Sequence, residues 1–261
     1  MDIESKKFLG QPKNFVSIFN ALLFDGQPVL KPEYLKDENS ELVMNVSSKH
    51  VDIIKRYEDG TYLDLFVIES QSYVDQCMVA RVMEYESVAR MRYIRQNFKK
   101  HVPMHTRLPM ILTVVLYVGE SKWNAAKRLS ELEIIHPGFE DMFNEFKLNL
   151  IELNTNHKYN TGEKATQDFF DLLRMIYRKQ ILKEDLDREF NRDALYFAYV
   201  VTKNKELLNI YQESEKGDVK VCRALDEMFE ESTNRGIQLG IKQGIERGEK
   251  IHKSKSRLRC S

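Results

Sequence analysis

Residues 52–71 read DIIKRYEDGTYLDLFVIESQ, and this stretch decides the fold. Two runs rich in β-branched and aromatic residues flank Glu58-Asp59-Gly60, which is a turn signal. We therefore expect a β-hairpin with strands over residues 50–57 and 61–71. Because alternate residues of a strand share a face, Glu69 and Gln71 are expected to project to the same side of the sheet.

The turn sets the register of this hairpin. A two-residue loop at Asp59 and Gly60 would place Asp52 opposite Val67 and diagonal to Glu69. Diagonal neighbours lie about 7–8 Å apart by backbone, which is close enough for two carboxylates to hold one hard cation. A slip of one residue would move Asp52 to the other face. The predicted site therefore depends on the register.

Magnesium is the cation that this site would suit. Mg²⁺ takes oxygen ligands and usually only one or two carboxylates, keeping waters and substrate phosphate for the other positions. Asp52 and Glu69 would supply two carboxylates, and the carbonyl of Ser70 would supply a further oxygen. The alternative is that both acids are ordinary strand-edge residues facing solvent.

The rest of the chain predicts an α/β fold. A short amphipathic helix over residues 14–24 ends at Asp25-Gly26, and a linker-like stretch covers residues 25–48. After the hairpin we expect a long helix over 74–100, a buried strand over 108–118 and a short strand over 148–153. The order strand, helix, strand indicates a crossover that sets parallel strands beside the hairpin. Beyond residue 156 the pattern becomes helical, over 166–182, 193–203 and 218–231.

Five motifs occur in an order that resembles one known family. They are Phe19-Asn-Ala-Leu-Leu-Phe24, Ile68-Glu-Ser-Gln-Ser72, Arg81-x-x-x-Tyr85, the run from Pro109 to Gly119 with Trp123, and the glycines Gly236, Gly240, Gly244 and Gly248. This order is similar to that of the Rpn recombination-promoting nucleases, also called putative transposases. They are a branch of the PD-(D/E)XK nuclease superfamily. The resemblance covers most of the chain.

The resemblance implies a restriction-endonuclease-like mixed sheet flanked by helices, with a helical C-terminal extension. On this basis residues 1–155 form the nuclease-like domain, 156–231 a helical region, and 232–261 a glycine-spaced tail. It also implies a bacterial, Mg²⁺- or Mn²⁺-dependent DNA endonuclease linked to recombination or transposition. Asp52 and Glu69 would hold the metal. Gln71 stands where the wider superfamily has Lys, so it would orient the attacking water but would not act as a base.

The long helix carries a basic stripe. Arg81, Tyr85, Val88, Arg92, Arg95 and Lys99 follow i+3/i+4 spacing, which places them along one face. We expect this face to contact DNA phosphates, with an ordinary solvated face as the alternative for Arg92, Arg95 and Lys99. The formal net charge of zero counts against a DNA-binding protein unless local patches bind the DNA.

The composition indicates a cytoplasmic protein. No apolar run approaches the length of a membrane-spanning helix, and the N-terminal residues lack a signal-peptide core. The three cysteines are far apart and form no CxxC pair, which fits free thiols in a reducing compartment.

Two other functions remain open from the sequence. One is a catalytically inactive module that keeps the nuclease fold and binds DNA or a protein partner, which the lack of a third acidic ligand favours. The other is an assembly protein. Its glycine-spaced tail would let two helices approach closely and so form a homo-oligomer.

Overall fold

The computed structural model describes most of the chain between residues 3 and 230. The described residues are 3–38, 53–60, 63–181, 185, 187–214, 217–230, 233–234, 237, 241 and 245. Asp52 and the four glycines of the tail, Gly236, Gly240, Gly244 and Gly248, lie outside them.

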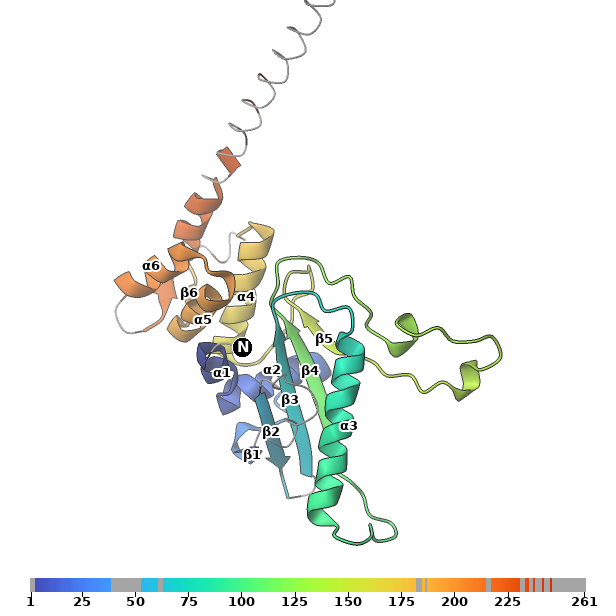
Figure 1. Cartoon of the computed structure of the whole chain (residues 1–261). Helices are drawn as coiled ribbons and strands as arrows, with labels where there is room; N and C mark the ends of the chain where they lie inside the picture. The colour runs from blue at the N-terminus through green and yellow to red at the C-terminus, as the bar shows by residue number, and fades with distance from the viewer. Residues whose placement is uncertain are drawn as a thin grey trace, which may run out of the picture.

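Within the described residues, five strands form one mixed sheet in the order β1-β2-β3-β4-β5 (Figure 1). They are β1 (Leu35–Asp37), β2 (Ile53–Glu58), β3 (Leu63–Gln71), β4 (Met110–Tyr117) and β5 (Asn149–Glu152). The first three strands pair antiparallel, whereas β3, β4 and β5 are parallel. The short strands β6 (Glu189–Phe190) and β7 (Val219–Lys220) pair separately. The predicted α/β fold of the restriction-endonuclease-like type is confirmed.

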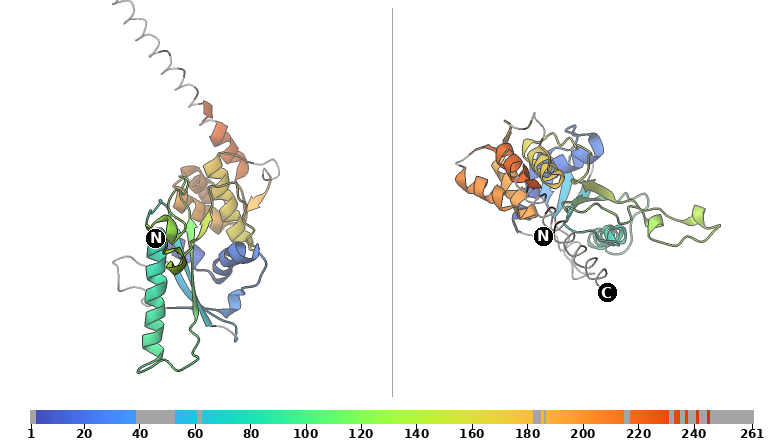
Figure 2. Two further views of the ribbon diagram at one scale, coloured as in Figure 1. Left: turned by 90° about the vertical axis from the view of Figure 1, so that its right-hand side faces the viewer. Right: turned by 90° about the horizontal axis from the view of Figure 1, so that it is seen from above.

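Helices cover both faces of the sheet. They are α1 (Ile3–Leu9), α2 (Pro12–Phe24), α3 (Met78–Asn97), α4 (Lys164–Arg178), α5 (Arg192–Thr202) and α6 (Lys205–Glu213), followed by a helix over 222–230. Short 3-10 turns are η1 (Pro32–Tyr34), η3 (Leu129–Glu131) and η4 (Glu140–Met142). Figures 1 and 2 show α3 alone on one face and α1, α2, α4 and α5 on the side of the other face. None of the described helices is long and apolar enough to cross a membrane.

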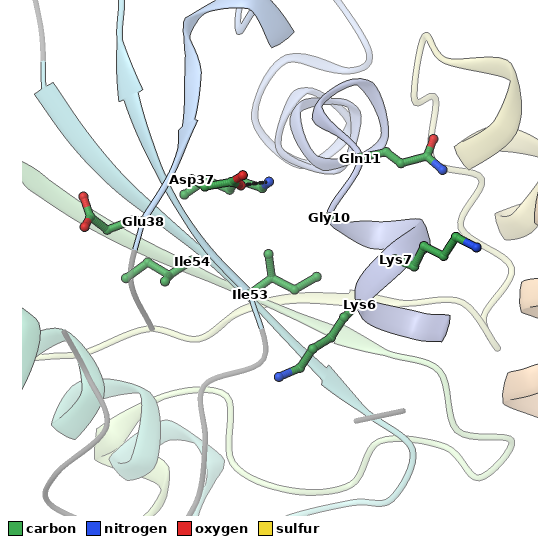
Figure 3. Close-up of a pocket in the computed structure, with 9 residues that line it drawn as sticks. Lys6, Lys7, Gly10, Gln11, Asp37, Glu38, Ile53 and Ile54 are labelled. Atoms are coloured by element: carbon green, nitrogen blue, oxygen red, sulfur yellow. Dashed lines mark hydrogen bonds and ion pairs between the residues drawn. The ribbon is translucent and has the colours of Figure 1, made fainter. Parts of the chain in front are cut away.

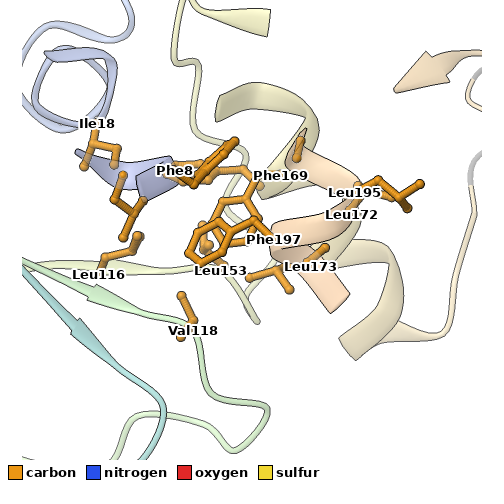
Figure 4. Packing of buried hydrophobic residues seen from close by; sticks show 14 of the residues in the cluster. Phe8, Ile18, Leu116, Val118, Leu153, Phe169, Leu172, Leu173, Leu195 and Phe197 are labelled. Atoms are coloured by element: carbon orange, nitrogen blue, oxygen red, sulfur yellow. The ribbon is translucent and has the colours of Figure 1, made fainter. Parts of the chain in front are cut away.

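The hydrophobic core is divided between the two faces of the sheet. On one face, Phe66, Ile68 and Leu116 belong to a large cluster with aromatic residues of α1, α4 and α5, such as Phe8, Phe169 and Phe197 (Figure 4). The rings of Phe169 and Phe197 stack with centroids 4.4 Å apart. On the other face, Leu65 and Val67 pack against Tyr85 and Ala89 of α3. The strand β3 is therefore a central strand covered on two sides.

The hairpin register differs from the predicted one. Ile54 lies opposite Val67, and the last pair is Glu58 with Leu63, so residues 59–62 connect the strands. The predicted two-residue loop with Asp52 opposite Val67 is therefore wrong, because longer loops also close hairpins. The shift is two residues, and since the side-chain period of a strand is also two, each described residue keeps its predicted face.

Other elements also begin or end at residues that differ from the predicted ones. The stretch that was predicted as a linker contains η1 and β1, and β1 pairs Leu35 with Tyr57 at the edge of the sheet. The long helix begins at Met78 because the Asp75 carboxylate accepts a hydrogen bond from the Cys77 amide at 2.9 Å in a local turn. Its end at Asn97 leaves Lys99 beyond the helix. The helix α6 was not predicted.

Candidate active site

Glu69 and Gln71 lie side by side at the C-terminal end of β3. Glu69 is 3% exposed and Gln71 5% exposed, and the Gln71 amide Nε2 donates a hydrogen bond to Glu69 Oε1 at 3.1 Å. Both side chains lie on the face of the sheet that α3 covers. The prediction that they project together is confirmed, and it follows from strand alternation alone.

Arg81 in the first turns of α3 reaches down to this carboxylate. Its Nη2 donates to Glu69 Oε1 at 3.2 Å, and its Nη1 forms an ion pair with Asp75. Its Nε and Nη2 also donate to the Tyr85 hydroxyl oxygen, at 3.1 and 2.8 Å. One guanidinium therefore links β3, the loop that follows it and α3.

The electrostatics keep Arg81 charged. Burial lowers the pKa of the Arg81 guanidinium, but hydrogen bonds from it to Asp75 and Tyr85 and the charge of Glu69 outweigh burial, so that its pKa lies above the ordinary value. Burial also raises the pKa of the Tyr85 hydroxyl, although the hydrogen bond from Arg81 opposes the rise. Glu69 thus faces a permanent cation.

The parallel strands bring a second polar group to the same end of the sheet. Gln71 pairs with Tyr117 on β4, and Tyr117 pairs with Glu152 on β5. Glu152 is buried and forms an ion pair with Lys127, while the Tyr117 hydroxyl donates to the Ser121 carbonyl at 2.7 Å. Glu152 and Lys127 were not among the predicted site residues. Glu152 directly follows apolar strand residues, as Glu69 does, and this pattern could have identified it from the sequence.

A further buried carboxyl, that of Glu86, lies on α3 just after Tyr85. Glu86 is 7% exposed, and its Oε1 accepts a hydrogen bond from the backbone N–H of Thr113 on β4 at 3.0 Å. Burial raises the pKa of Glu86, and the hydrogen bonds with Thr113 oppose this rise. Sequence reasoning did not single out Glu86, because its burial depends on how the helix packs.

The remaining predicted metal ligands are placed only in part. Ser70 is half-buried between Glu69 and Gln71. Asp52 lies outside the described residues, but it directly precedes Ile53, and Ile53 pairs with Ile68, the neighbour of Glu69. Among the described residues, no group of three or more His, Cys, Asp and Glu side chains gathers in a way that could hold a metal ion.

A cleft of 430 Å³ opens beside the start of β2 (Figure 3). Lys6, Lys7 and Gln11 line one side of it, and Ile53 and Ile54 line another. Lys55, also in its lining, forms an ion pair with Asp37. The lining also contains Glu38, so the cleft carries both signs of charge, with Lys6 and Lys7 as exposed cations on its α1 side.

The predicted basic stripe on α3 divides into two parts. Arg81 and Tyr85 turn inward to Glu69, with Tyr85 only 5% exposed. Arg92 is half-buried, Arg95 is exposed, and Lys99 is exposed beyond the helix end. The structure therefore brings the first two residues to the predicted site and leaves the other three away from it.

A family model described as "Putative transposase, YhgA-like" matches residues 33–207. The match covers two-thirds of the chain and includes β1 to β5, α3 and the Glu69-Ser70-Gln71 segment. The chain belongs to this YhgA-like family. Membership associates it with transposition and agrees with the resemblance found in its motifs. No curated protein and no solved structure matched the chain.

Proposed function

We propose that this member of the YhgA-like family is a divalent-metal-dependent DNA endonuclease that hydrolyses phosphodiester bonds during transposition or recombination. The observation that carries the proposal is the buried Glu69–Gln71 pair at the end of a central strand. Burying a carboxylate and an amide there costs free energy that a purely structural position would avoid with apolar residues. We place the activity in the bacterial cytoplasm, in keeping with the free thiols of Cys77 and Cys222.

The donor atoms fit a hard cation such as Mg²⁺ or Mn²⁺. Asp52, Glu69 and the Ser70 carbonyl would hold it, and all of them offer oxygen. A set of one or two carboxylates is usual for Mg²⁺, so the lack of a larger acidic cluster in the described chain is compatible with the proposal. When bound, the ion would lower the pKa of a water and neutralise charge on the phosphate.

Arg81 positions Glu69 in this proposal. Its guanidinium and the Gln71 amide both donate to Oε1, which fixes the rotamer of the carboxylate. Tyr85 and Asp75 in turn fix Arg81. The geometry supports a positioning role for Arg81 and Tyr85, in place of the DNA contacts expected from the sequence.

Gln71 orients the attacking water by hydrogen bonding. Its amide can donate and accept hydrogen bonds, but it cannot take a proton at neutral pH. DNA phosphates would contact Arg92, Arg95 and Lys99 together with Lys6 and Lys7 of the cleft. A chain of zero net charge then binds DNA through local patches.

Plasmid cleavage tests this proposal. We expect wild-type protein to cleave DNA in Mg²⁺ or Mn²⁺, and we expect cleavage to be lost in Asp52→Ala, in Glu69→Gln and in EDTA. Asp64→Asn is the matched control, because Asp64 lies at the other end of β3 and accepts a hydrogen bond from the Met110 amide. Cleavage that survives both site substitutions in folded protein would contradict the proposal.

The second candidate function is a non-catalytic module that keeps the fold. The ion pair between Arg81 and Glu69 favours it, because a guanidinium already compensates the buried carboxylate. Folded wild-type protein that cleaves neither supercoiled, linear nor single-stranded DNA, and binds no Mn²⁺, would support this candidate.

A further inference from the structure

An acidic and apolar arm projects from the end of β4. The arm comprises residues 129–146 and includes η3 and η4 (Figures 1 and 2). Its base is ordered by hydrogen bonds from the Leu129 amide to the Phe146 carbonyl and from the Leu148 amide to the Lys127 carbonyl, each 2.9 Å. Leu129 and Leu148 are buried beneath it. Backbone hydrogen bonds and buried leucines therefore anchor the base of the arm to the rest of the protein.

The tip of the arm exposes large apolar side chains. Ile134 is 97% exposed, Met142 76% and Phe139 58%. These three residues line a hollow of 390 Å³ together with Ile135 and Phe143. Exposed apolar surface that is gathered in one place and rimmed by polar residues marks an interaction site.

The rim of the arm is uniformly acidic. The arm contains five acids and no Lys or Arg, and all five are exposed: Glu131, Glu133, Glu140, Asp141 and Glu145. The hydroxyl of Ser130 hydrogen-bonds to Glu145 and lowers the pKa of its carboxyl, so that this group stays ionised. A nucleic acid would be repelled by this arm. The arm therefore requires a partner surface that is both basic and apolar.

The same chain presents such a surface at the other end of α3. We call it the basic end: residues 90–107, the last turns of α3 and the loop after it. It contains no acid and six basic residues, Arg90, Arg92, Arg95, Lys99, Lys100 and Arg107. Exposed apolar residues lie among them, with Met104 85% exposed, Met91 48% and Val102 44%. No ion pair between described residues involves Arg95 or Lys99.

One copy does not bring the arm to its own basic end. Figures 1 and 2 show the arm extending away from the body, while the loop after α3 lies at the far end of the helix. The arm and the basic end carry opposite charges, and both expose apolar residues. Since the whole chain has zero net charge, this separation of charge favours contact between copies.

We infer that the arm of one copy docks on the basic end of a second copy, with Met104 of the partner filling the hollow at Ile134, Phe139 and Met142. Reciprocal docking across a two-fold axis uses both arms at once and forms a closed dimer. The inference stands independently of the proposed nuclease activity, because it uses neither Glu69 nor a metal. It does require DNA and the arm to compete for Arg92, Arg95 and Lys99.

Charge reversal and rescue test the contact in the full-length chain. The arm-reversed variant carries Glu133→Lys, Glu140→Lys and Asp141→Lys, and the basic-end variant carries Arg92→Glu, Arg95→Glu and Lys99→Glu. Each variant alone should associate about a hundredfold more weakly than wild type in sedimentation velocity, because the arm-reversed contact becomes repulsive and the basic-end variant has no net charge left to attract the arm. An equimolar mixture of the two variants should recover association, because in a mixed pair the five acids of one unchanged arm meet the six basic residues of one unchanged basic end, and the substituted side chains of the other contact are again opposite in sign.

The apolar part of the contact has its own variants. Ile134→Ser and Met104→Ser should each weaken association about tenfold, whereas Ile3→Ser, at a site 79% exposed on α1, should not. All of these residues are exposed, so folding should be preserved. Identical sedimentation of wild type and both charge-reversed variants would overturn the inference. So would a mixture that fails to recover association. Loss of DNA binding alone in the basic-end variant, with unchanged mass, would assign that surface to DNA instead.

Discussion

At the scale of single residues, the site is organised around the carboxylate of Glu69. Strand alternation predicts that Glu69 and Gln71 share a face, and the hydrogen bond between them confirms it. The sequence could not show that Arg81 binds Glu69, because this contact depends on how α3 lies over the sheet. Spacing along the helix placed Arg81 in a basic stripe, although its side chain is turned inward.

Arg81 should stabilise the fold through this contact. Replacing it in Arg81→Met leaves the buried carboxylate of Glu69 without its cation, which should lower the free energy of unfolding by about 3 kcal/mol. Urea denaturation measures this change. Arg95→Met is the matched control on the same helix, and its exposed side chain should change stability by less than about 0.5 kcal/mol. Equal stabilities of the two variants would argue against the proposed role.

Glu86 should give the protein a measurable pH dependence. Its pKa is raised above the ordinary value of 4.5, chiefly by burial, so the folded state holds this proton more tightly than the unfolded chain does. Ionisation of Glu86 therefore lowers stability as the pH rises from 4.5 through its folded pKa. Glu86→Gln keeps an oxygen for the Thr113 amide and should resist urea better than wild type at pH 8.

The advantage of Glu86→Gln should shrink as the pH falls towards 4.5, where the wild-type carboxyl is protonated. The exposed Glu133→Gln serves as the control and should show no such trend. A difference between wild type and Glu86→Gln that stays constant across this range would contradict the assignment.

At the scale of elements, the long periodic segments and the short strand β5 were predicted correctly, whereas the short elements α1, α6, β1, β6 and β7 were not predicted. The runs that became α2, β3, α3 and β4 carry enough apolar residues to define their type. The strand β1 has only three residues, and it forms because the edge of β2 offers it a partner. The hairpin loop was predicted too short, because residues 59–62 allow several turn lengths.

A buried ionic cluster should hold α4 to the segment before α5. Arg188 forms ion pairs with Asp168 and Asp171 of α4, whose side chains are 1% and 3% exposed. Arg188→Met should lower the free energy of unfolding by about 2 kcal/mol. Both buried carboxylates lose a charged hydrogen-bond partner, although Asp168 keeps its ion pair with Lys164 and Asp171 keeps its ion pair with Arg174. Arg223→Met breaks an exposed pair with Asp187 and should cost less than about 0.5 kcal/mol. Similar losses in the two variants, measured by urea denaturation, would contradict this explanation.

At the scale of the whole molecule, one core joins the N-terminal and C-terminal halves. Phe8 and Leu116 share a hydrophobic cluster with Phe169, Phe197 and Leu225. Composition suggested a boundary near residue 156, and the division into 1–155, 156–231 and 232–261 stays a prediction. Sequence patterns could not reveal the shared core, because its contacts join residues more than a hundred positions apart.

The fragment 1–155 should therefore fail to fold alone. Removing α4 and α5 exposes Phe8, Leu116 and Leu153, which the cluster otherwise buries. We expect the full chain to unfold in one cooperative transition by near-ultraviolet circular dichroism, and the fragment to show none. A cooperative transition in the fragment would establish residues 1–155 as an independent domain.

The central claim is that carboxylates at the end of β3 hold a divalent cation. Electron paramagnetic resonance of Mn²⁺ titrated into the protein tests it without relying on catalysis. We predict saturable binding of about one Mn²⁺ per wild-type chain, strongly weakened in Asp52→Asn and in Glu69→Gln and unchanged in Asp64→Asn. Equal Mn²⁺ affinity in wild type and both site variants, all folded, would contradict the account.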